Sequence, residues 1–448
     1  MVACLPLSSV CHYGVATLSH GWPSLRGVDR IAVTGLYCFA LGVFAAPALA
    51  NVGLGLLALA AAARPRAAWS ALSRHPVCLP LLALALYLAA QAVRLALAPG
   101  LTAAGAGVLA DLAKLALLLP LGIAVAGQAG RAGRALALAG LSLLLCMALH
   151  TRPAVLWQAL GDGQTRLGFG LPMIAFGLYA ATALLGLVLL VPAYTARLPG
   201  ARRYVLLATA AAAMVVVGMG LLLCRSRGAW LALALTLPPC AVWTLWRGVL
   251  PRPALAGLAA VLLAGVLING EAVARRVADD RAAYEALAVL MGVPAAAHAQ
   301  PAALPGDSVG MRLRLAELAL VRWLEQPWLG LGPDAGRQIV VHAGDPELAA
   351  MAHLHNTYLE LLVRFGVLGL AGLAAVLVGL GVGVRRAVRT AALAPPIVIF
   401  LAGALSITLI WSAFDFRLLT QDFRFYTVLL GGIAFGLGLP RREATCAS

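Results

Sequence analysis

The chain has 448 residues, of which 62% are hydrophobic and only 11% charged, and its mean hydropathy is +0.94. Because about a quarter of the residues in a soluble domain are charged, this composition excludes a soluble globular protein. Lysine and arginine number 33 against 17 acidic residues, a net charge of +16. The basic residues lie between apolar runs, where they orient membrane proteins, so we expect a multi-spanning membrane protein and no binding to nucleic acid.

Apolar runs near the ~20 residues that a helix needs to cross a bilayer determine the predicted organisation. We expect an all-α integral membrane protein with about twelve transmembrane helices and one long helical loop. An N-terminal tail (1–29) precedes nine spans within 30–270, the loop covers 271–356, three spans lie within 357–440, and a tail (441–448) ends the chain. The predicted spans lie near residues 30–47, 48–63, 77–97, 107–127, 135–150, 168–192, 204–224, 229–246, 254–270, 357–384, 395–414 and 426–440.

The distribution of arginine predicts which side of the membrane each segment faces. With the N-terminus in the cytoplasm, the inner segments hold many arginines but only two acidic residues, Asp29 and Glu443, whereas the outer segments are balanced in charge. Arginine and lysine near span ends stay cytoplasmic. Both termini are therefore expected in the cytoplasm, and the long loop on the outer face.

Within the loop, residues 271–290 have the pattern of a helix, and 298–310 form a break rich in proline and glycine. The segment 311–328 predicts an amphipathic helix, which either lies on the membrane surface or packs over the bundle. GLGPDAG (330–336) is interpreted as a turn that serves shape, because no strand precedes it and no GK[ST] follows.

Two arginines lie in a tight outer turn, Cys224-Arg225-Ser226-Arg227-Gly228-Ala229-Trp230. If arginine served only orientation, an outer turn would not need them. Guanidinium groups bind phosphate oxygens bidentately, and the N-terminus of the following helix adds a positive dipole, so Arg225 and Arg227 are candidates for holding an anionic ester. The alternative is that both side chains extend to lipid headgroups.

The segment His353-Leu354-His355-Asn356-Thr357-Tyr358-Leu359-Glu360 begins the tenth span. Thr357 and Glu360 match a capping box, which predicts that a helix starts there. The positive end of that helix disfavours imidazolium, so His355 is a candidate general base, or alternatively a cap or hydrogen-bonded filler. His353 and His355 have no third ligand at a fitting spacing, so no metal site is expected.

Other polar residues are secondary candidates. Arg312 opens the amphipathic helix, and Arg314, two positions later, is its competitor. Asp111 and Lys114 fall inside one span, three positions apart, where they are expected to pair. Arg94, Arg152 and Arg166 are candidates for holding the phosphates of a substrate or carrier, with headgroup anchoring as the alternative; His353 and Asn356 complete the set of accessory residues.

The combination of RSRGAW, the loop motif GMR, WLEQPWLGLGPDAG and HLHNTYLELLVRFGVLGL resembles the O-antigen ligase and polymerase superfamily, in specific motifs over roughly 215–375 and in topology over the whole chain. The resemblance implies a GT-C type glycosyltransferase of the bacterial inner membrane. Its active site would be periplasmic, and its donor a glycan on undecaprenyl diphosphate. By motif, Arg225 and Arg227 match RSRG, Arg312 matches GMR, and His355 matches the HN dipeptide.

The residue types are compatible with this chemistry. Transfer from a lipid diphosphate leaves an anion that a metal or fixed cations must stabilise, and no carboxylate cluster for Mg²⁺ is apparent in the sequence. We therefore expect no cofactor: Arg225, Arg227 and Arg312 would clamp the diphosphate, and His355 would take the proton of the incoming hydroxyl. One displacement would invert the anomeric centre.

A ligase and three alternatives to it remain at this point. Within the superfamily, a ligase would transfer O-antigen to the lipid A-core acceptor, a polymerase would transfer it to another carrier-linked repeat, and related oligosaccharyltransferases transfer glycans to protein. A secondary transporter of twelve spans belongs to a different class, which usually has repeated halves and binding groups at the midplane. The absence of an evident repeat and the motifs above favour the ligase.

Overall fold

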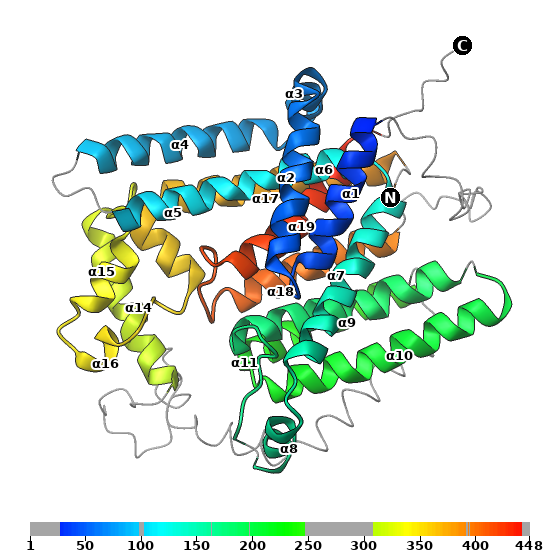
Figure 1. Cartoon of the computed structure of the whole chain (residues 1–448). Helices are drawn as coiled ribbons and strands as arrows, with labels where there is room; N and C mark the ends of the chain where they lie inside the picture. The colour runs from blue at the N-terminus through cyan, green and yellow to red at the C-terminus, as the bar shows by residue number, and fades with distance from the viewer. Residues whose placement is uncertain are drawn as a thin grey trace, which may run out of the picture.

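The computed structural model describes residues 27–97, 103–162, 164–196, 198–246, 308–390, 393 and 395–440, and every regular element in these ranges is helical (Figure 1). The helices are α1 (Gly27–Gly42), α2 (Pro47–Ala62), α3 (Pro65–Arg74), α4 (Cys78–Leu97), α5 (Ala103–Ala113), the 3-10 helix η1 (Lys114–Leu117), α6 (Leu118–Val125), α7 (Ala129–His150), α8 (Pro153–Gly161), α9 (Met173–Thr195), α10 (Gly200–Leu223), α11 (Arg227–Trp246), α14 (Ser308–Glu325), α15 (Ala335–Val341), α16 (Pro346–Ala349), α17 (Thr357–Arg389), α18 (Pro395–Trp411) and α19 (Gln421–Gly438).

Seven of the described helices, counting α5 to α6 as one, are long and apolar enough to cross a membrane: α4, α5–α6, α7, α9, α10, α11 and α17. An eighth candidate joins α2 to α3, which bends away by 93°, and α18 is a shorter apolar helix. Each predicted span within the described ranges coincides with a helix or, for 107–127, with α5, η1 and α6. The span at 254–270 and the loop helix at 271–290 lie outside the described residues, so the number twelve stays a prediction.

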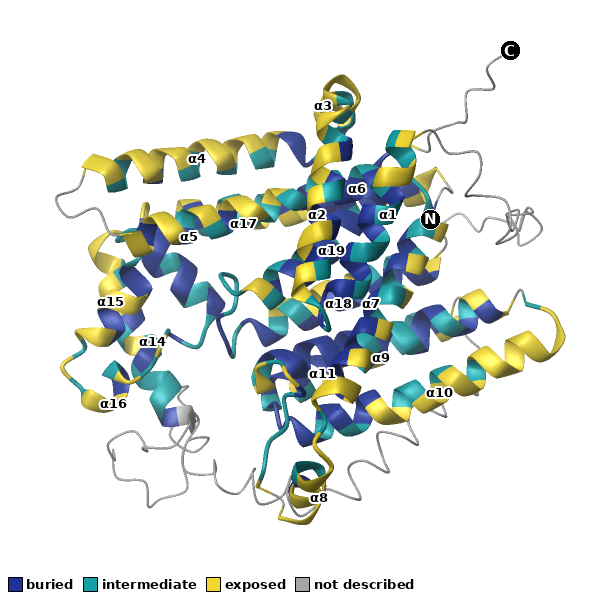
Figure 2. Cartoon of the chain, viewed as in Figure 1, coloured by how far each residue is buried: buried dark blue, intermediate teal, exposed yellow. Residues whose placement is uncertain are grey.

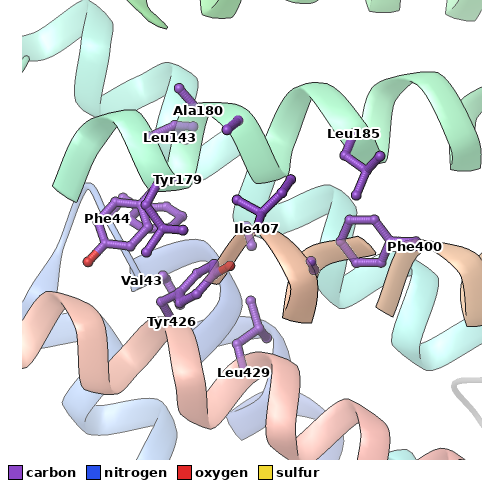
Figure 3. Close-up of a cluster of buried hydrophobic side chains, with 14 of the residues drawn as sticks. Val43, Phe44, Leu143, Tyr179, Ala180, Leu185, Phe400, Ile407, Tyr426 and Leu429 are labelled. Atoms are coloured by element: carbon purple, nitrogen blue, oxygen red, sulfur yellow. The ribbon is translucent and has the colours of Figure 1, made fainter. Parts of the chain in front are cut away.

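The hydrophobic core is centred on α9, which packs against α10, α11 and α18 and most of whose residues are buried. Phe44, Tyr179 and Tyr426 meet within it, and Phe400 lies farther along the same cluster, beside Leu185 (Figure 3). At the periphery, α4 and α10 are mostly exposed along their length (Figure 2), and the exposed side chains include Leu86 and Val215. An exposed apolar surface of this extent is the surface that a bilayer covers.

The bundle has two ends that differ in what they carry. At one end, here called the loop end, lie α8, α14, α15 and α16 and the starts of α11 and α17 (Figure 1). Thr357 at the start of α17 donates its backbone N–H to the Ser412 carbonyl after α18, 2.8 Å away. At the opposite end, Gly127 bonds to Gly436 near the end of α19 at 2.7 Å. All the motif residues of the sequence therefore gather at the loop end.

Glycines let α6 and α19 pack backbone to backbone. A Cβ on Gly122 would lie 2.7 Å from the carbonyl oxygen of Gly432 and 2.9 Å from the backbone nitrogen of Gly436. A Cβ on Gly436 would lie 2.7 Å from Cβ of Val125. This GxxxG arrangement on α19 stabilises membrane helices through close van der Waals contact, because lipid supplies no hydrophobic driving force between them.

Gly122→Ala is expected to destabilise the protein by about 1–3 kcal/mol, because the new methyl group overlaps the backbone of α19. Gly381→Ala on α17 is the matched control, since nothing lies within 4 Å of a Cβ built there. Thermal unfolding of both variants in detergent measures the difference. Equal midpoints for the two would contradict close packing of α6 on α19.

Candidate active site

The RSRG motif forms the turn between α10 and α11, and two glycines, which lack side chains, let this turn pack closely against the bundle. A Cβ on Gly177 of α9 would lie 2.7 Å from Cβ of Ser226, and one on Gly228 would lie 2.9 Å from Cβ of Phe414. Arg225 adopts the left-handed region, with φ of 51°, and is buried. The contact of Gly228 with Phe414 brings Arg227 next to the connection between α18 and α19.

The arginines around this turn have different partners. Arg225 donates through Nη2 to the carbonyl of Ala159 in the last turn of α8, at 3.3 Å. A cation suits this position, because the carbonyl end of a helix is negative. Arg166 donates through Nε to the Cys224 carbonyl at 3.1 Å, whereas Arg152, which precedes α8, is exposed. Arg225 and Arg166 thus tie the segment around α8 to the turn, and Arg227 is half-buried.

Helix α17 begins at Thr357, as the sequence predicts, but the capping box is wrong. The cap is Asn356, whose side chain accepts hydrogen bonds from the backbone N–H groups of Tyr358 at 2.9 Å and Leu359 at 3.2 Å. Thr357 instead donates its hydroxyl to the Asp415 carbonyl at 2.7 Å. Asparagine is as good a cap as threonine and leaves that hydroxyl free for a tertiary contact.

Glu360 is fully buried and forms an ion pair with Arg364, one turn later. Nη2 of Arg364 lies 2.5 Å from Oε1 of Glu360, and Oε2 of Glu360 accepts a hydrogen bond from the Leu354 N–H at 3.0 Å. Arg364 also donates to the Pro333 carbonyl and lies over the Phe416 ring, 5.5 Å from its centre. This pair therefore links three segments: the histidine loop, the GLGPDAG turn and the α18–α19 connection.

Helix α17 breaks at Gly366, whose φ of 60° and ψ of −168° are not helical. Residues 326–332 dock on this break: Leu331 N–H donates to Val363 and Gly332 N–H to Arg364, and Gly330 and Gly332 have positive φ. GLGPDAG is thus a shape-forming turn, as predicted. The predicted span that starts at 357 is a short helix before the break and a longer one after it.

One face of α4 holds this break in place. Tyr87 donates to the Phe365 carbonyl at 2.5 Å, Gln91 to the Leu329 carbonyl at 2.9 Å, and Arg94 to the Gly330 carbonyl at 2.8 Å. Arg94 also donates to the Gln326 side chain. Tyr87 thus satisfies a carbonyl that the broken helix leaves open, and Gln91 and Arg94 satisfy carbonyls of the docked segment 326–332, as backbone away from water requires. Arg94, a candidate for holding substrate phosphates, therefore contacts the 326–332 segment of the protein itself.

His353 and His355 meet Asp415, which comes from the α18–α19 connection. Asp415 Oδ1 lies 3.3 Å from Nδ1 of His355 and 3.6 Å from Nε2 of His353, and the ligand atoms of the three lie within 4.8 Å of one another. The His355 backbone N–H donates to Nδ1 of His353 at 3.1 Å, so Nδ1 of His353 is unprotonated. Among the described residues, this is the group with donors suited to a metal ion.

Charge around Asp415 is arranged so that the carboxylate is ionised. Burial raises the pKa of Asp415, but contact with His355 and the fields of both imidazoles outweigh it and lower the pKa below its usual value. Burial likewise lowers the pKa of His353, reinforced by His355, which favours the neutral ring. Arg417 contributes its Nε 3.6 Å from Asp415 Oδ2.

The two arginines of the loop helix point to different partners. Burial lowers the pKa of Arg312, and the negative charge of Asp415 opposes this shift, so Arg312 lies in the field of the cluster. Arg314 forms ion pairs with Asp345 at 3.1 Å and Glu347 at 2.7 Å, away from it. Helix α14 starts at Ser308, inside the predicted break, and packs Leu315 and Ala319 against α15 and α17 while Leu324 stays exposed.

The fold thus brings His355, His353 and Arg312 together and puts the RSRG turn next to the same connection. Sequence reasoning missed Asp415 and Arg417, and it also missed Arg424, which with Lys114 pairs to Asp111 at 2.6 and 2.8 Å. The pairing of Asp111 with Lys114 is confirmed. The available signal for Asp415 was a pair of opposite charges in FDFR, between two apolar segments on the side predicted to carry His355.

The fold and site define an all-α membrane protein with a polar, arginine-rich cluster at one end of its helix bundle. Residues 212–374 match the family model described as O-antigen ligase. This match supports a place for the chain in the O-antigen ligase and polymerase superfamily, and the members of the matched family are glycosyltransferase-like enzymes. The matched range contains RSRG, GMR and His355 but ends before Asp415. No curated protein matches the chain.

Glu360→Gln is expected to destabilise the protein by about 3–5 kcal/mol, because it leaves the buried Arg364 charge without its counter-charge. The matched control is Arg322→Gln, which breaks an ion pair of half-exposed side chains with Glu325 and should cost at most about 1 kcal/mol. The free energies of unfolding in detergent are compared. A Glu360→Gln variant as stable as the control would contradict the linking role of this pair.

Proposed function

We propose that this protein is an O-antigen ligase, which transfers O-antigen polysaccharide from undecaprenyl diphosphate to the lipid A-core oligosaccharide. The distribution of arginine supports a location in the bacterial inner membrane with both termini cytoplasmic and the loop end periplasmic. The reaction is metal-independent and inverting, as in glycosyltransferases of the GT-C type. The family match at 212–374 supports this class over a transporter.

The observation that carries the proposal is the contact between His355 and Asp415 within a group of arginines. Because Nδ1 of His355 faces the carboxylate at 3.3 Å, a proton on Nδ1 is stabilised there. Nε2 is then the basic nitrogen. A carboxylate that fixes the tautomer and orientation of a histidine is the arrangement that makes imidazole an effective general base.

In the proposed reaction, Nε2 of His355 takes the proton from the acceptor hydroxyl as its oxygen attacks the anomeric carbon of the donor sugar. The bond from that carbon to the diphosphate oxygen breaks, and undecaprenyl diphosphate leaves with the electron pair. Attack from the face opposite the leaving group inverts the anomeric centre. Asp415 stabilises the imidazolium that forms, and the proton later passes to solvent.

The leaving diphosphate needs positive charge at fixed positions. Arg227 and Arg312 are proposed to contact its oxygens, and Arg417 adds charge beside Asp415. Arg225 contributes its charge to the same turn while its guanidinium holds α8. Fixed guanidinium groups in a site screened from water stabilise a developing anion strongly, because they need no reorganisation as the bond breaks.

Deleting the gene is expected to leave lipid A-core without polymer while the polymer stays on its carrier. Gel electrophoresis of lipopolysaccharide from the deletion strain shows whether the lipid A-core carries polymer. Core that carries one repeat would instead identify a polymerase. Restoring the gene should return the full ladder.

A gene that encodes Arg227→Lys should not restore the ladder, because lysine keeps the charge but loses the bidentate fork of arginine. A normal ladder with this variant would contradict diphosphate clamping.

In a purified transfer assay, His355→Ala is expected to lower kcat by about 10² or more, as loss of a general base does. Asp415→Asn should lower kcat to a similar extent, about 10²-fold, with KM for the donor little changed, because asparagine stabilises neither the tautomer nor the imidazolium. Asp415→Glu should restore part of the rate. Exposed His342 on α15 provides the control, His342→Ala. Near-normal turnover of His355→Ala would reduce this histidine to a structural role.

A further inference from the structure

The cluster of His353, His355 and Asp415 has the donor atoms of a metal site that the sequence did not predict. The sequence argument found no third ligand near the two histidines. The fold supplies one from the connection between α18 and α19, about sixty residues later. Two imidazole nitrogens and one carboxylate oxygen form the set that divalent transition metals prefer, whereas Mg²⁺ and Ca²⁺ prefer oxygen ligands alone.

The separations of Asp415 from the two histidines match those of ligands on a single ion. Zinc binds nitrogen at about 2.0–2.1 Å and carboxylate oxygen at about 2.0–2.2 Å, so neighbouring ligands of a tetrahedral site lie roughly 3.3–3.5 Å apart. Asp415 Oδ1 lies 3.3 Å from Nδ1 of His355 and 3.6 Å from Nε2 of His353. The ligand atoms of the three residues lie within 4.8 Å of one another, so an ion can be bound once side-chain rotations bring the two imidazole nitrogens closer together, and its fourth position stays open.

Each of the three atoms is available for coordination. His353 already uses Nδ1 to accept the His355 backbone N–H, which leaves Nε2 facing Asp415. Nδ1 of His355 and Oδ1 of Asp415 are buried, and within the part of the chain that the structure describes their 3.3 Å contact with each other is electrostatic and not a well-formed hydrogen bond. Buried polar atoms in this state are costly, and a bound cation would satisfy both.

The surroundings hold the ligands in place. The hydroxyl of Thr357 donates to the Asp415 carbonyl at 2.7 Å, and Phe416 lies edge-on to His353, with ring centres 6.0 Å apart. Arg417 faces Oδ2, the carboxylate oxygen that the site does not use. The positive charges of Arg417 and Arg312 oppose a cation, so binding should be reversible and weaker than in a structural zinc site.

We propose that His353, His355 and Asp415 bind a divalent transition-metal ion such as Zn²⁺, and that this ion inhibits the enzyme. The inhibitory part rests on the proposed function. A metal on Nδ1 of His355 and Oδ1 of Asp415 replaces the contact that orients the base. Coordination uses the lone pair of Nδ1, so the neutral ring then carries its proton on Nε2 and has no lone pair there to accept the proton of the incoming hydroxyl. The bound ion therefore blocks the general base.

Binding is tested with the full chain purified in detergent and freed of metal. Titration with Zn²⁺, followed by calorimetry and by metal analysis after dialysis, should show one equivalent that His353→Gln loses or binds about tenfold more weakly or worse. Titration with Co²⁺ should give the visible absorption of a tetrahedral site with nitrogen and oxygen ligands. His342→Gln, on an exposed histidine, is the control and should bind as the wild type does. Equal Zn²⁺ binding by wild type and His353→Gln would overturn the site.

The transfer assay separates this inference from the proposed function. Zn²⁺ should inhibit wild-type transfer and EDTA should restore it, whereas His353→Gln should need about tenfold more Zn²⁺ for the same fractional inhibition of its own rate. Transfer without Zn²⁺ binding at the cluster overturns the inference and leaves the proposed function intact. Zn²⁺ binding by a protein without transfer activity supports the site and overturns the function. Stimulation by Zn²⁺ with loss of activity in EDTA overturns inhibition.

Discussion

The arrangement of the loop end depends on the buried ion pair between Glu360 and Arg364. A buried pair repays the desolvation of its charges only when further hydrogen bonds satisfy it, and here Leu354 N–H and the Pro333 carbonyl do so. Both partners come from segments that have no regular structure of their own. The pair thus fixes the histidine loop on one side and the GLGPDAG turn on the other. His355 lies one residue beyond a backbone group that Glu360 holds.

The break at Gly366 imposes the second requirement. Where a helix is interrupted away from water, the open backbone groups around the break need partners. From α4, Tyr87 donates to the Phe365 carbonyl of the broken helix, and Gln91 and Arg94 donate to carbonyls of the docked segment 326–332. These residues follow at intervals of four and three, so they share one face of the helix. The rest of α4 is little buried, and its polar contacts with the break therefore matter more to its position than hydrophobic packing does.

The sequence was most informative where a local pattern decides the structure. Hydropathy predicted the helices because a membrane helix must satisfy its own backbone, and the amphipathic pattern predicted α14. The start of α17 followed from the polar run before an apolar one, although asparagine caps the helix and threonine does not. Asp415 could not be assigned in this way, because its role depends on a contact between segments about sixty residues apart. The same holds for Arg312 and Arg314, whose directions depend on where Asp415, Asp345 and Glu347 lie.

Asp415 determines the balance of charge in the cluster. It is buried and ionised, and it faces two imidazoles, Arg417 and the field of Arg312. One negative charge cannot balance this many positive groups once a histidine is protonated, so the free site carries surplus positive charge. A diphosphate supplies the missing negative charge, and its departure after transfer restores the surplus. A divalent metal ion would add to the surplus instead, which is why it should bind to the free site only weakly and reversibly.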